Sequence, residues 1–136
     1  MSGSNSPVLT AYAESLGIRV FGEEDGAPVL AFEFGGDVEG RPQHLHGGAI
    51  SGLLETAGYA LLQRELEKRD RKHRLKPINI TVQFLSPGKQ KTTYAKARIT
   101  KLGSRNANIA IEAWQDDRDR PIATATINIL MGEPDS

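Results

Sequence analysis

The sequence of 136 residues contains no cysteine. This absence excludes disulfide bonds, thiolate zinc sites and cysteine nucleophiles. A chain that needs no disulfide suits a reducing compartment, and we expect the protein to be cytoplasmic.

Neither sign of charge is in excess, because 17 Lys and Arg residues balance 17 Asp and Glu residues. No overall charge therefore attracts the chain to nucleic acid or to a membrane surface. The sequence also lacks an apolar run of the ~20 residues that a bilayer-spanning helix needs. Residues 1–6 are polar and without the basic start and apolar run of a secretory signal, so we expect a disordered tail there. The sequence predicts no nucleic-acid partner and no membrane partner.

The length suits a single domain, which we place at residues 7–136. A long helix is marked by one apolar stripe at spacings of three and four residues, formed by Ile50, Leu53, Leu54, Ala57, Leu61 and Leu66. We expect helices over 7–16 and 48–68, strands over 18–21, 29–34, 77–85, 92–101, 108–115 and 121–131, a turn over 23–26 and a linker over 35–46. Because one helix stripe and one sheet face must cover each other, the fold class is α+β, with an antiparallel sheet wrapped around one long helix.

Glu55 is the only charged residue between Gly47 and Gln63. No Lys, Arg or His stands three or four positions away, where a helix would place a partner. Most acidic residues on helices are solvated surface groups, but the neighbours of Glu55 are small or apolar. An unpaired carboxylate is costly to bury, so we expect Glu55 to face a cleft as a candidate catalytic group.

His46, Gly47 and Gly48 stand at the beginning of the same helix. The first amide groups of a helix are unpaired and carry a partial positive charge, and glycine lets a ligand approach the backbone closely. An ordinary turn and helix cap would have the same residues. The pattern also fits a site for the oxyanion that develops on a carbonyl under attack.

The spacing of these two features has a consequence for assembly. Gly47 and Glu55 are eight residues apart, or roughly 12 Å along a helix axis. One helix cannot easily place both on the same carbonyl carbon, whereas two antiparallel helices related by a two-fold axis can. Two-fold dimers are the commonest oligomers, and we expect a monomer to be inactive.

These residues carry a resemblance to a known family. The segment His46–Ile50 (HGGAI), with an acidic residue eight positions after its first glycine, resembles the PaaI-like hot-dog thioesterases. The stretches Asn79–Pro87, Ala97–Trp114 and Ala123–Thr126 are similar to the strands and turns that follow the helix in that family. The resemblance covers about residues 12–132.

The resemblance implies a hot-dog fold, in which subunits pair into dimers and usually into tetramers. It implies hydrolysis of an acyl-CoA thioester without a metal or other cofactor. The catalytic set is then Glu55, Gly47 and His46. The Gly47 amide polarises the thioester carbonyl, and Glu55 of the partner subunit acts as general base or as nucleophile.

The resemblance also implies a set of substrate-binding residues. Leu85, Ser86 and Pro87 match a region that contacts the pantetheine of the coenzyme, and Lys101, Gly103 and Arg105 match one that contacts its phosphates. Cations suit phosphates, although a solvated turn would have the same residues. Gly48 and Tyr59 complete the set, and Tyr59 fits either the acyl pocket or the core.

The sequence departs from the family pattern in three places. Gly40 stands where many relatives have Asn or Gln, with Gln43 or His44 as candidate substitutes, Glu55 stands where many have Asp, and Pro77 stands where some have a polar residue. A non-catalytic acyl-CoA binding or sensor protein on the same fold is therefore the alternative function.

Two other functions fit the sequence less well. A hot-dog dehydratase or hydratase places its His and acid at a spacing unlike that of His46 and Glu55. His44 and His46 without a third nearby ligand make a poor zinc site. The basic residues over 68–76 suit a solvated helix end. The preferred acyl group stays open.

Overall fold

The computed structural model describes residues 11–33, 35 and 47–134. Its elements in chain order are α1 (Ala11–Ser15), β1 (Arg19–Glu24), β2 (Ala27–Phe32), α2 (Gly47–Lys68), β3 (Arg74–Phe84), β4 (Thr93–Leu102), β5 (Asn106–Trp114) and β6 (Ala123–Gly132). The predicted order of elements and the α+β class are confirmed. The predicted tail over 1–6 and nearly all of the linker over 35–46 lie outside the described residues.

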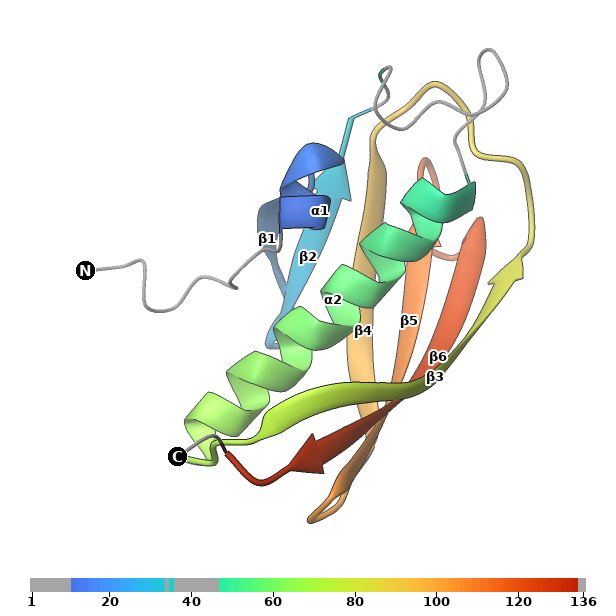
Figure 1. Ribbon diagram of the computed structural model, residues 1–136. Coiled ribbons are helices and arrows are strands. Elements are labelled where there is room, and N and C mark those ends of the chain that lie inside the picture. Colours follow the sequence, from blue (N-terminus) through green and yellow to red (C-terminus); the bar gives the residue numbers. More distant parts are fainter. Residues whose placement is uncertain (1–10, 34, 36–46, 135–136) are drawn as a thin grey trace.

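Six strands form one antiparallel sheet in the order β1-β2-β4-β5-β6-β3. The sheet curves around α2, which crosses one of its faces (Figure 1). This places β1 and β3 at the two edges, with four strands between them. The sheet therefore has one face on the helix and one face away from it.

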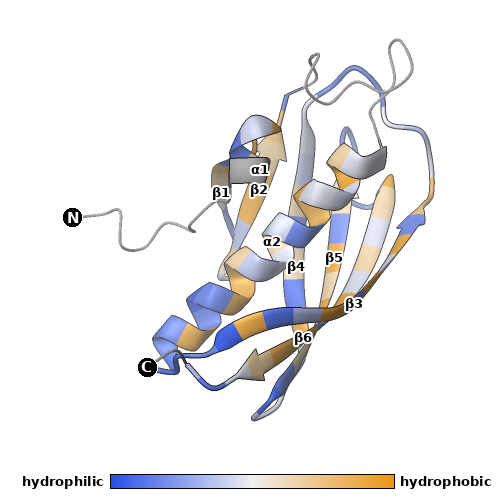
Figure 2. Cartoon of the chain, viewed as in Figure 1, coloured by the Kyte–Doolittle hydropathy of each residue, from blue (hydrophilic) through white to orange (hydrophobic). Residues whose placement is uncertain are grey.

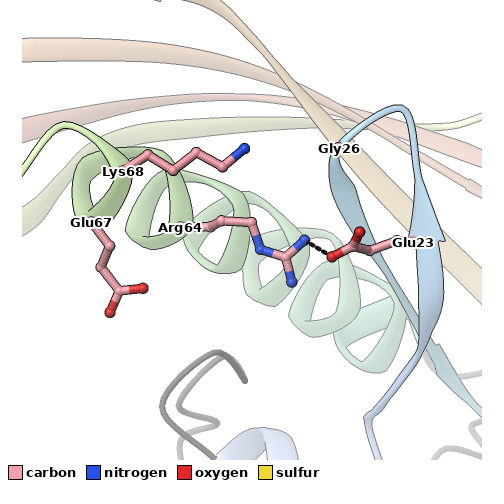
Figure 3. A pocket seen from close by; sticks show the side chains of 5 residues that line it. All are labelled: Glu23, Gly26, Arg64, Glu67 and Lys68. Atoms are coloured by element: carbon pink, nitrogen blue, oxygen red, sulfur yellow. Dashed lines mark hydrogen bonds and ion pairs between the residues drawn. The ribbon is translucent and has the colours of Figure 1, made fainter. Parts of the chain in front are cut away.

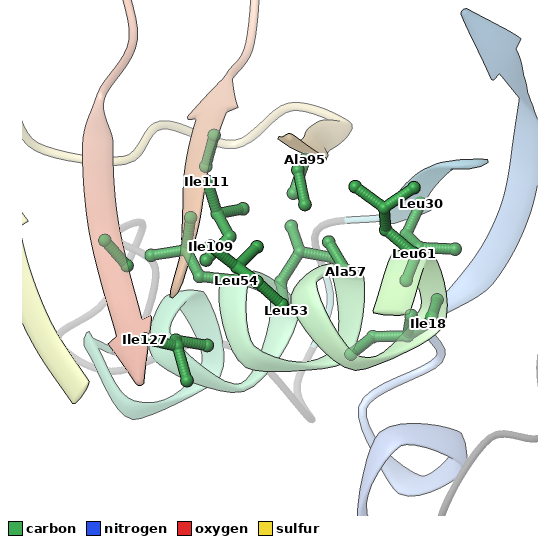
Figure 4. Packing of buried hydrophobic residues seen from close by; sticks show 14 of the residues in the cluster. Ile18, Leu30, Leu53, Leu54, Ala57, Leu61, Ala95, Ile109, Ile111 and Ile127 are labelled. Carbon is green, nitrogen blue, oxygen red and sulfur yellow. The ribbon is translucent and has the colours of Figure 1, made fainter. Parts of the chain in front are cut away.

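The core lies between α2 and the concave face of the sheet. Leu53, Leu54, Ala57 and Leu61 point from the helix towards apolar side chains of the sheet such as Ile127 (Figure 4). All six residues of the predicted apolar stripe are buried. Figure 2 shows the same division, with hydrophobic residues along the middle of α2 and hydrophilic ones at its C-terminal end.

The first hairpin has a tighter turn than the predicted four-residue one. β1 continues to Glu24, and only Asp25 and Gly26 connect it to β2. Both have positive φ angles, 54° and 79°, which a two-residue type I′ turn requires. Asp-Gly is a preferred sequence for that turn, because glycine adopts positive φ without strain.

The strand after the long helix differs most from the prediction. β3 begins at Arg74, three residues before Pro77, so Pro77 lies inside the strand and is not its first residue as predicted. The pairing of β3 with β6 shifts register between Pro77 and Asn79, which is a β-bulge. A proline is tolerated there because β3 is an edge strand and the amide that Pro77 lacks need not join the ladder.

The predicted apolar face of this strand is also only partly buried. Val82 packs against the core, but Ile78, Ile80 and Phe84 are exposed. The alternation of apolar and polar residues correctly indicated a strand. It did not reveal that the strand lies at the edge of the sheet, where α2 covers it only in part.

Candidate functional site

Gly47 is the first residue of α2, so its amide has no carbonyl acceptor within the helix. The ring of Phe84 stands beside it: a Cβ on Gly47 would lie 3.6 Å from the Phe84 Cζ atom, an ordinary contact distance. Phe84 comes from the last position of β3 and is more than half exposed. The end of the edge strand and the beginning of the helix thus meet at this point.

Glu55 lies two turns further along α2 and is half-buried. Among the described residues it makes no hydrogen bond and no ion pair. Its charge acts on Tyr59, one turn further on: burial raises the pKa of the Tyr59 hydroxyl to about 12, and the nearby Glu55 carboxylate adds to the rise. The carboxylate and the phenol therefore share one flank of the helix.

A single chain does not bring Glu55 to Gly47. The eight positions that separate them correspond to about 12 Å of helix, and α2 is continuous over this length. His46, the third predicted catalytic residue, lies outside the described residues, as do Gly40, Gln43 and His44. One chain therefore supplies the amide and the carboxylate at two separate places on its surface.

Leu85, Ser86 and Pro87 begin the connection from β3 to β4, residues 85–92, and all three are exposed. The amides of Leu85 and Ser86 both donate to the carbonyl of Ile122, at 2.8 and 3.2 Å. In Figure 1 the connection passes over the sheet at the end where α2 begins. The structure therefore places this predicted substrate segment at the same end of the molecule as Gly47.

Lys101, Gly103 and Arg105 lie at the opposite end of the molecule, in the hairpin between β4 and β5. They line a hollow of about 470 Å³ together with Ile78, Ser104, Asn106, Asn108 and Asn128. A bulge between Ile99 and Lys101 precedes the hairpin. Within one chain these residues are remote from Gly47.

Arg71 fixes that hairpin to the end of the helix. Its Nη2 donates to the carbonyls of Gly103 and Ser104, at 3.1 and 3.3 Å. Its Nε also donates to His73, at 3.2 Å, and the other ring nitrogen of His73 contacts the Gly132 carbonyl at 3.1 Å. The basic segment after α2 therefore has a structural role in addition to solvation.

A second hollow, of about 480 Å³, lies between α2 and the first hairpin (Figure 3). It is lined by Glu23, Gly26, Arg64, Glu67 and Lys68, and an ion pair joins Arg64 to Glu23. Arg64 is nine residues from Glu55, roughly 180° around the helix. This hollow faces away from the candidate catalytic carboxylate.

Two negative findings concern the described part of the chain. No group of three or more His, Asp or Glu residues there could hold a metal ion. No helix among those residues is long and apolar enough to cross a bilayer.

Sequence reasoning missed two residues, Phe84 beside the start of α2 and Gln115 beside the 85–92 connection. Phe84 was predicted only as a strand residue, and Gln115 only as the end of a strand. The side chain of Gln115 holds the 85–92 connection through hydrogen bonds to Lys89. The apolar alternation could have indicated Phe84, whereas no sequence signal marks a side chain that binds a loop 26 residues away.

Comparisons with known proteins concern the family and the fold. The family model of the thioesterase superfamily matches residues 42–122. A protein from Chromobacterium violaceum is 33% identical, over 88% of this chain and 82% of that one, with a TM-score of 0.70. A search of curated proteins gave no match.

More distant solved structures share the fold. The Escherichia coli PaaI protein from the phenylacetic acid degradation operon is 21% identical, over 88% of this chain and 87% of that one, with a TM-score of 0.72. A mutant form of a Staphylococcus aureus thioesterase is 20% identical, over 90% of this chain and 99% of that one, with a TM-score of 0.78.

The chain belongs to the thioesterase superfamily, since the family match covers more than half of it. The hot-dog fold and the resemblance to the PaaI-like group are confirmed.

Proposed function

We propose that the protein is a metal-free acyl-CoA thioesterase that hydrolyses a thioester to a free acid and CoA. Family membership supports thioester hydrolysis in general. In the reaction, water adds its oxygen to the carbonyl carbon and the C–S bond breaks. The thiolate leaves and takes up the proton that the water gives up.

The observation that carries the proposal is the half-buried carboxylate of Glu55, which has no ion-pair partner among the described residues. Glu55 of the partner subunit removes a proton from the attacking water or attacks the carbonyl itself. The Gly47 amide stabilises the negative charge on the carbonyl oxygen, because it points from the positive end of α2 and has no acceptor within the helix. Gly48 lets the substrate approach the first turn closely, and Tyr59 lines the acyl pocket beside Glu55.

The edge strand β3 supports the dimer that this site requires. It is eleven residues long, and it pairs only with β6 among the described strands. Ile78, Ile80, Phe84 and the following Leu85 are exposed apolar residues along it. A long, apolar, unpaired edge favours association with another strand.

The opposite edge is shorter and more interrupted than β3. β1 has six residues, and a bulge between Val20 and Gly22 leaves no more than three consecutive paired residues. β3 also has a bulge, beside Pro77, but residues 79–84 after it pair without interruption. Because short length and bulges prevent pairing at an edge, the second half of β3 is the better edge for a second subunit.

Antiparallel pairing of β3 with its symmetry mate explains the separation of the predicted binding residues. It places the beginning of β3 in one subunit next to the end of β3 in the other. The hairpin with Lys101, Gly103 and Arg105 of the partner subunit then approaches Gly47, Leu85, Ser86 and Pro87. The cations bind the phosphates of the coenzyme, the 85–87 segment contacts its pantetheine, and two dimers associate into a tetramer.

A thiol-release assay on a panel of aromatic, short-chain and medium-chain acyl-CoAs tests the proposal. We expect turnover in the wild type and a loss of about 10³-fold or more in Glu55→Ala, the scale on which an essential catalytic group acts. Glu65→Gln is the matched control, because Glu65 is a second carboxylate on α2 that is paired with Arg69 at 2.9 Å. Binding of acyl-CoA by the wild type without turnover would instead support the sensor function.

A further inference from the structure

We propose that Gln115 is a positioning residue that fixes the connection between β3 and β4, residues 85–92, in its substrate-binding conformation. The inference rests on the proposed function, in which Leu85, Ser86 and Pro87 of this connection contact the coenzyme. β3 and β4 are not neighbours in the sheet, since β5 and β6 lie between them. The connection therefore spans the ends of β5 and β6 without a strand beside it (Figure 1).

Gln115 supplies the pairing that a neighbouring strand would provide. The Lys89 amide donates to Gln115 Oε1 at 3.1 Å, and Gln115 Nε2 donates to the Lys89 carbonyl at 3.1 Å. One side-chain amide thus satisfies both polar groups of one backbone residue. The geometry resembles a hydrogen-bonded pair in an antiparallel ladder.

Gln115 is itself held in place by the sheet. Its Nε2 also donates to Thr93 Oγ1 at 3.1 Å, and Thr93 is the fully buried first residue of β4. On its other side, Gln115 directly follows Trp114, the last residue of β5. The amide therefore joins the connection to two strands that are fixed by the core.

The other anchors of the connection act elsewhere or are weaker. The Ile122 carbonyl holds only Leu85 and Ser86, at the beginning. Lys91 pairs with Asp116 at 2.5 Å, but both side chains are largely exposed, and exposed ion pairs contribute little. Thr92 Oγ1 donates to the exposed Glu33 at 2.5 Å, and Thr93 Oγ1 donates to the Lys91 carbonyl at 3.4 Å through the same hydroxyl that accepts from Gln115. Among these anchors, Gln115 is the half-buried side chain that holds both backbone polar groups of one residue of the connection.

Loss of this anchor should weaken substrate binding and leave the chemical step intact. Without Gln115, the polar groups of Lys89 turn to water. Leu85 and Ser86 stay on the Ile122 carbonyl, whereas Pro87, the predicted substrate residue nearest to Lys89, samples more positions. Glu55 and Gly47 lie on α2 and are unaffected. An interaction that holds the substrate equally in the ground state and the transition state changes KM and leaves kcat unchanged.

The experiment compares Gln115→Met with Asp116→Asn in steady-state kinetics on the best acyl-CoA substrate. Met keeps the length of the side chain and removes all three hydrogen bonds. Asp116→Asn removes the exposed ion pair from the same connection and serves as the matched control. Circular dichroism, and hydrogen exchange at the Lys89 amide, show whether each variant keeps the fold and frees the connection.

We expect Gln115→Met to raise KM about fivefold or more, to change kcat less than twofold, and to speed exchange at Lys89, whereas Asp116→Asn changes KM less than twofold. An unchanged KM, or a kcat that falls while KM rises, would overturn the inference. If the wild type binds acyl-CoA without turnover, the proposed hydrolysis is wrong, but the inference about Gln115 is still tested. The dissociation constant of acyl-CoA then replaces KM in the same comparison. If the wild type neither binds nor hydrolyses acyl-CoA, both fail.

Discussion

The Cδ1 atom of Ile127 lies 3.2 Å from the point where a Cβ on Gly58 would stand. The Cδ1 atom of Ile111 lies 3.4 Å from the same point, and both isoleucines are buried in the sheet. Gly58 is therefore the place where α2 approaches the sheet most tightly among the glycines whose surroundings the structure gives. The close approach sets the height of Glu55 above the sheet, because Glu55 is one turn away on the same helix.

Gly58→Ala should destabilise the protein by about 1 kcal/mol. Alanine favours a helix interior by about 1 kcal/mol over glycine, but an added methyl in a packed core costs about 1–3 kcal/mol. Urea unfolding measures the difference in the free energy of unfolding. Gly22→Ala is the control, because no atom lies within 4 Å of its Cβ position, and a Gly58→Ala protein more stable than the wild type would contradict the packing described above.

Tyr59 predicts a specific dependence of stability on high pH. Its pKa of about 12 in the folded protein is above the ordinary value of about 10 in an unfolded chain. The folded state therefore holds the proton more tightly, and its contribution is fully present below pH ~10 and is lost as the pH rises to ~12. The free energy of unfolding of the wild type should fall more steeply over this interval than that of Tyr59→Phe, and equal slopes would contradict it.

The same tyrosine reports on Glu55. Glu55→Gln removes the negative charge that adds to the rise, so the pKa of Tyr59 should fall, but only partly, because burial is the larger cause. Titration of the ring signal of Tyr59 by NMR measures the change. A pKa that does not move would show that the two side chains are further apart than the structure places them.

The edge strand predicts a difference between two lysine substitutions. Ile80 on β3 is 38% exposed, and Val20 on β1 is 40% exposed, so the two sites are matched within one chain. Ile80→Lys places a charge in the proposed dimer interface and should give folded, inactive monomers, whereas Val20→Lys should stay dimeric and active. Sedimentation velocity measures the assembly, and a wild-type monomer or a dimeric Ile80→Lys would contradict the β3 interface.

Local sequence patterns predicted the helices and strands. The order of the strands in the sheet depends on long-range pairing and was not predicted. The apolar stripe of α2 was readable because Leu53, Leu54 and Ala57 follow the helix period, and all three are buried. The position of β3 at an edge was not readable, since it depends on which strands pair across the whole chain. For that reason Ile80 and Phe84 were expected on a covered face and are exposed.

The candidate site divides in the same way. Glu55 and Gly47 were chosen as candidates from chemistry and spacing alone, because a single acid on an apolar helix and a glycine at its beginning are local features. Gln115 was not found, because its role depends on a connection that returns to it through the fold. Lys101 and Arg105 were found only through the family resemblance.

The role of the Gly47 N–H can be tested separately from the absence of a side chain at this position. Gly47→Pro removes the N–H at the first helical position, where proline is well tolerated. Gly47→Ala keeps the N–H and adds a methyl 3.6 Å from the Phe84 ring, which is ordinary contact. We expect a loss of about 10²–10³-fold in kcat for the proline variant, a clearly smaller loss for alanine, and normal folding of both; equal losses would contradict the role of the amide.

The most direct test of the shared site is complementation between two inactive variants, Gly47→Pro and Glu55→Gln. Each is first shown to be inactive and dimeric alone, and the two are then co-expressed. If the amide of one subunit works with the carboxylate of the other, every mixed dimer has one site with both groups intact and one with neither. Random pairing in equal amounts should then restore roughly a quarter of the wild-type activity. If both groups came from the same chain, each site would carry one defect, and the mixture would stay as inactive as its components.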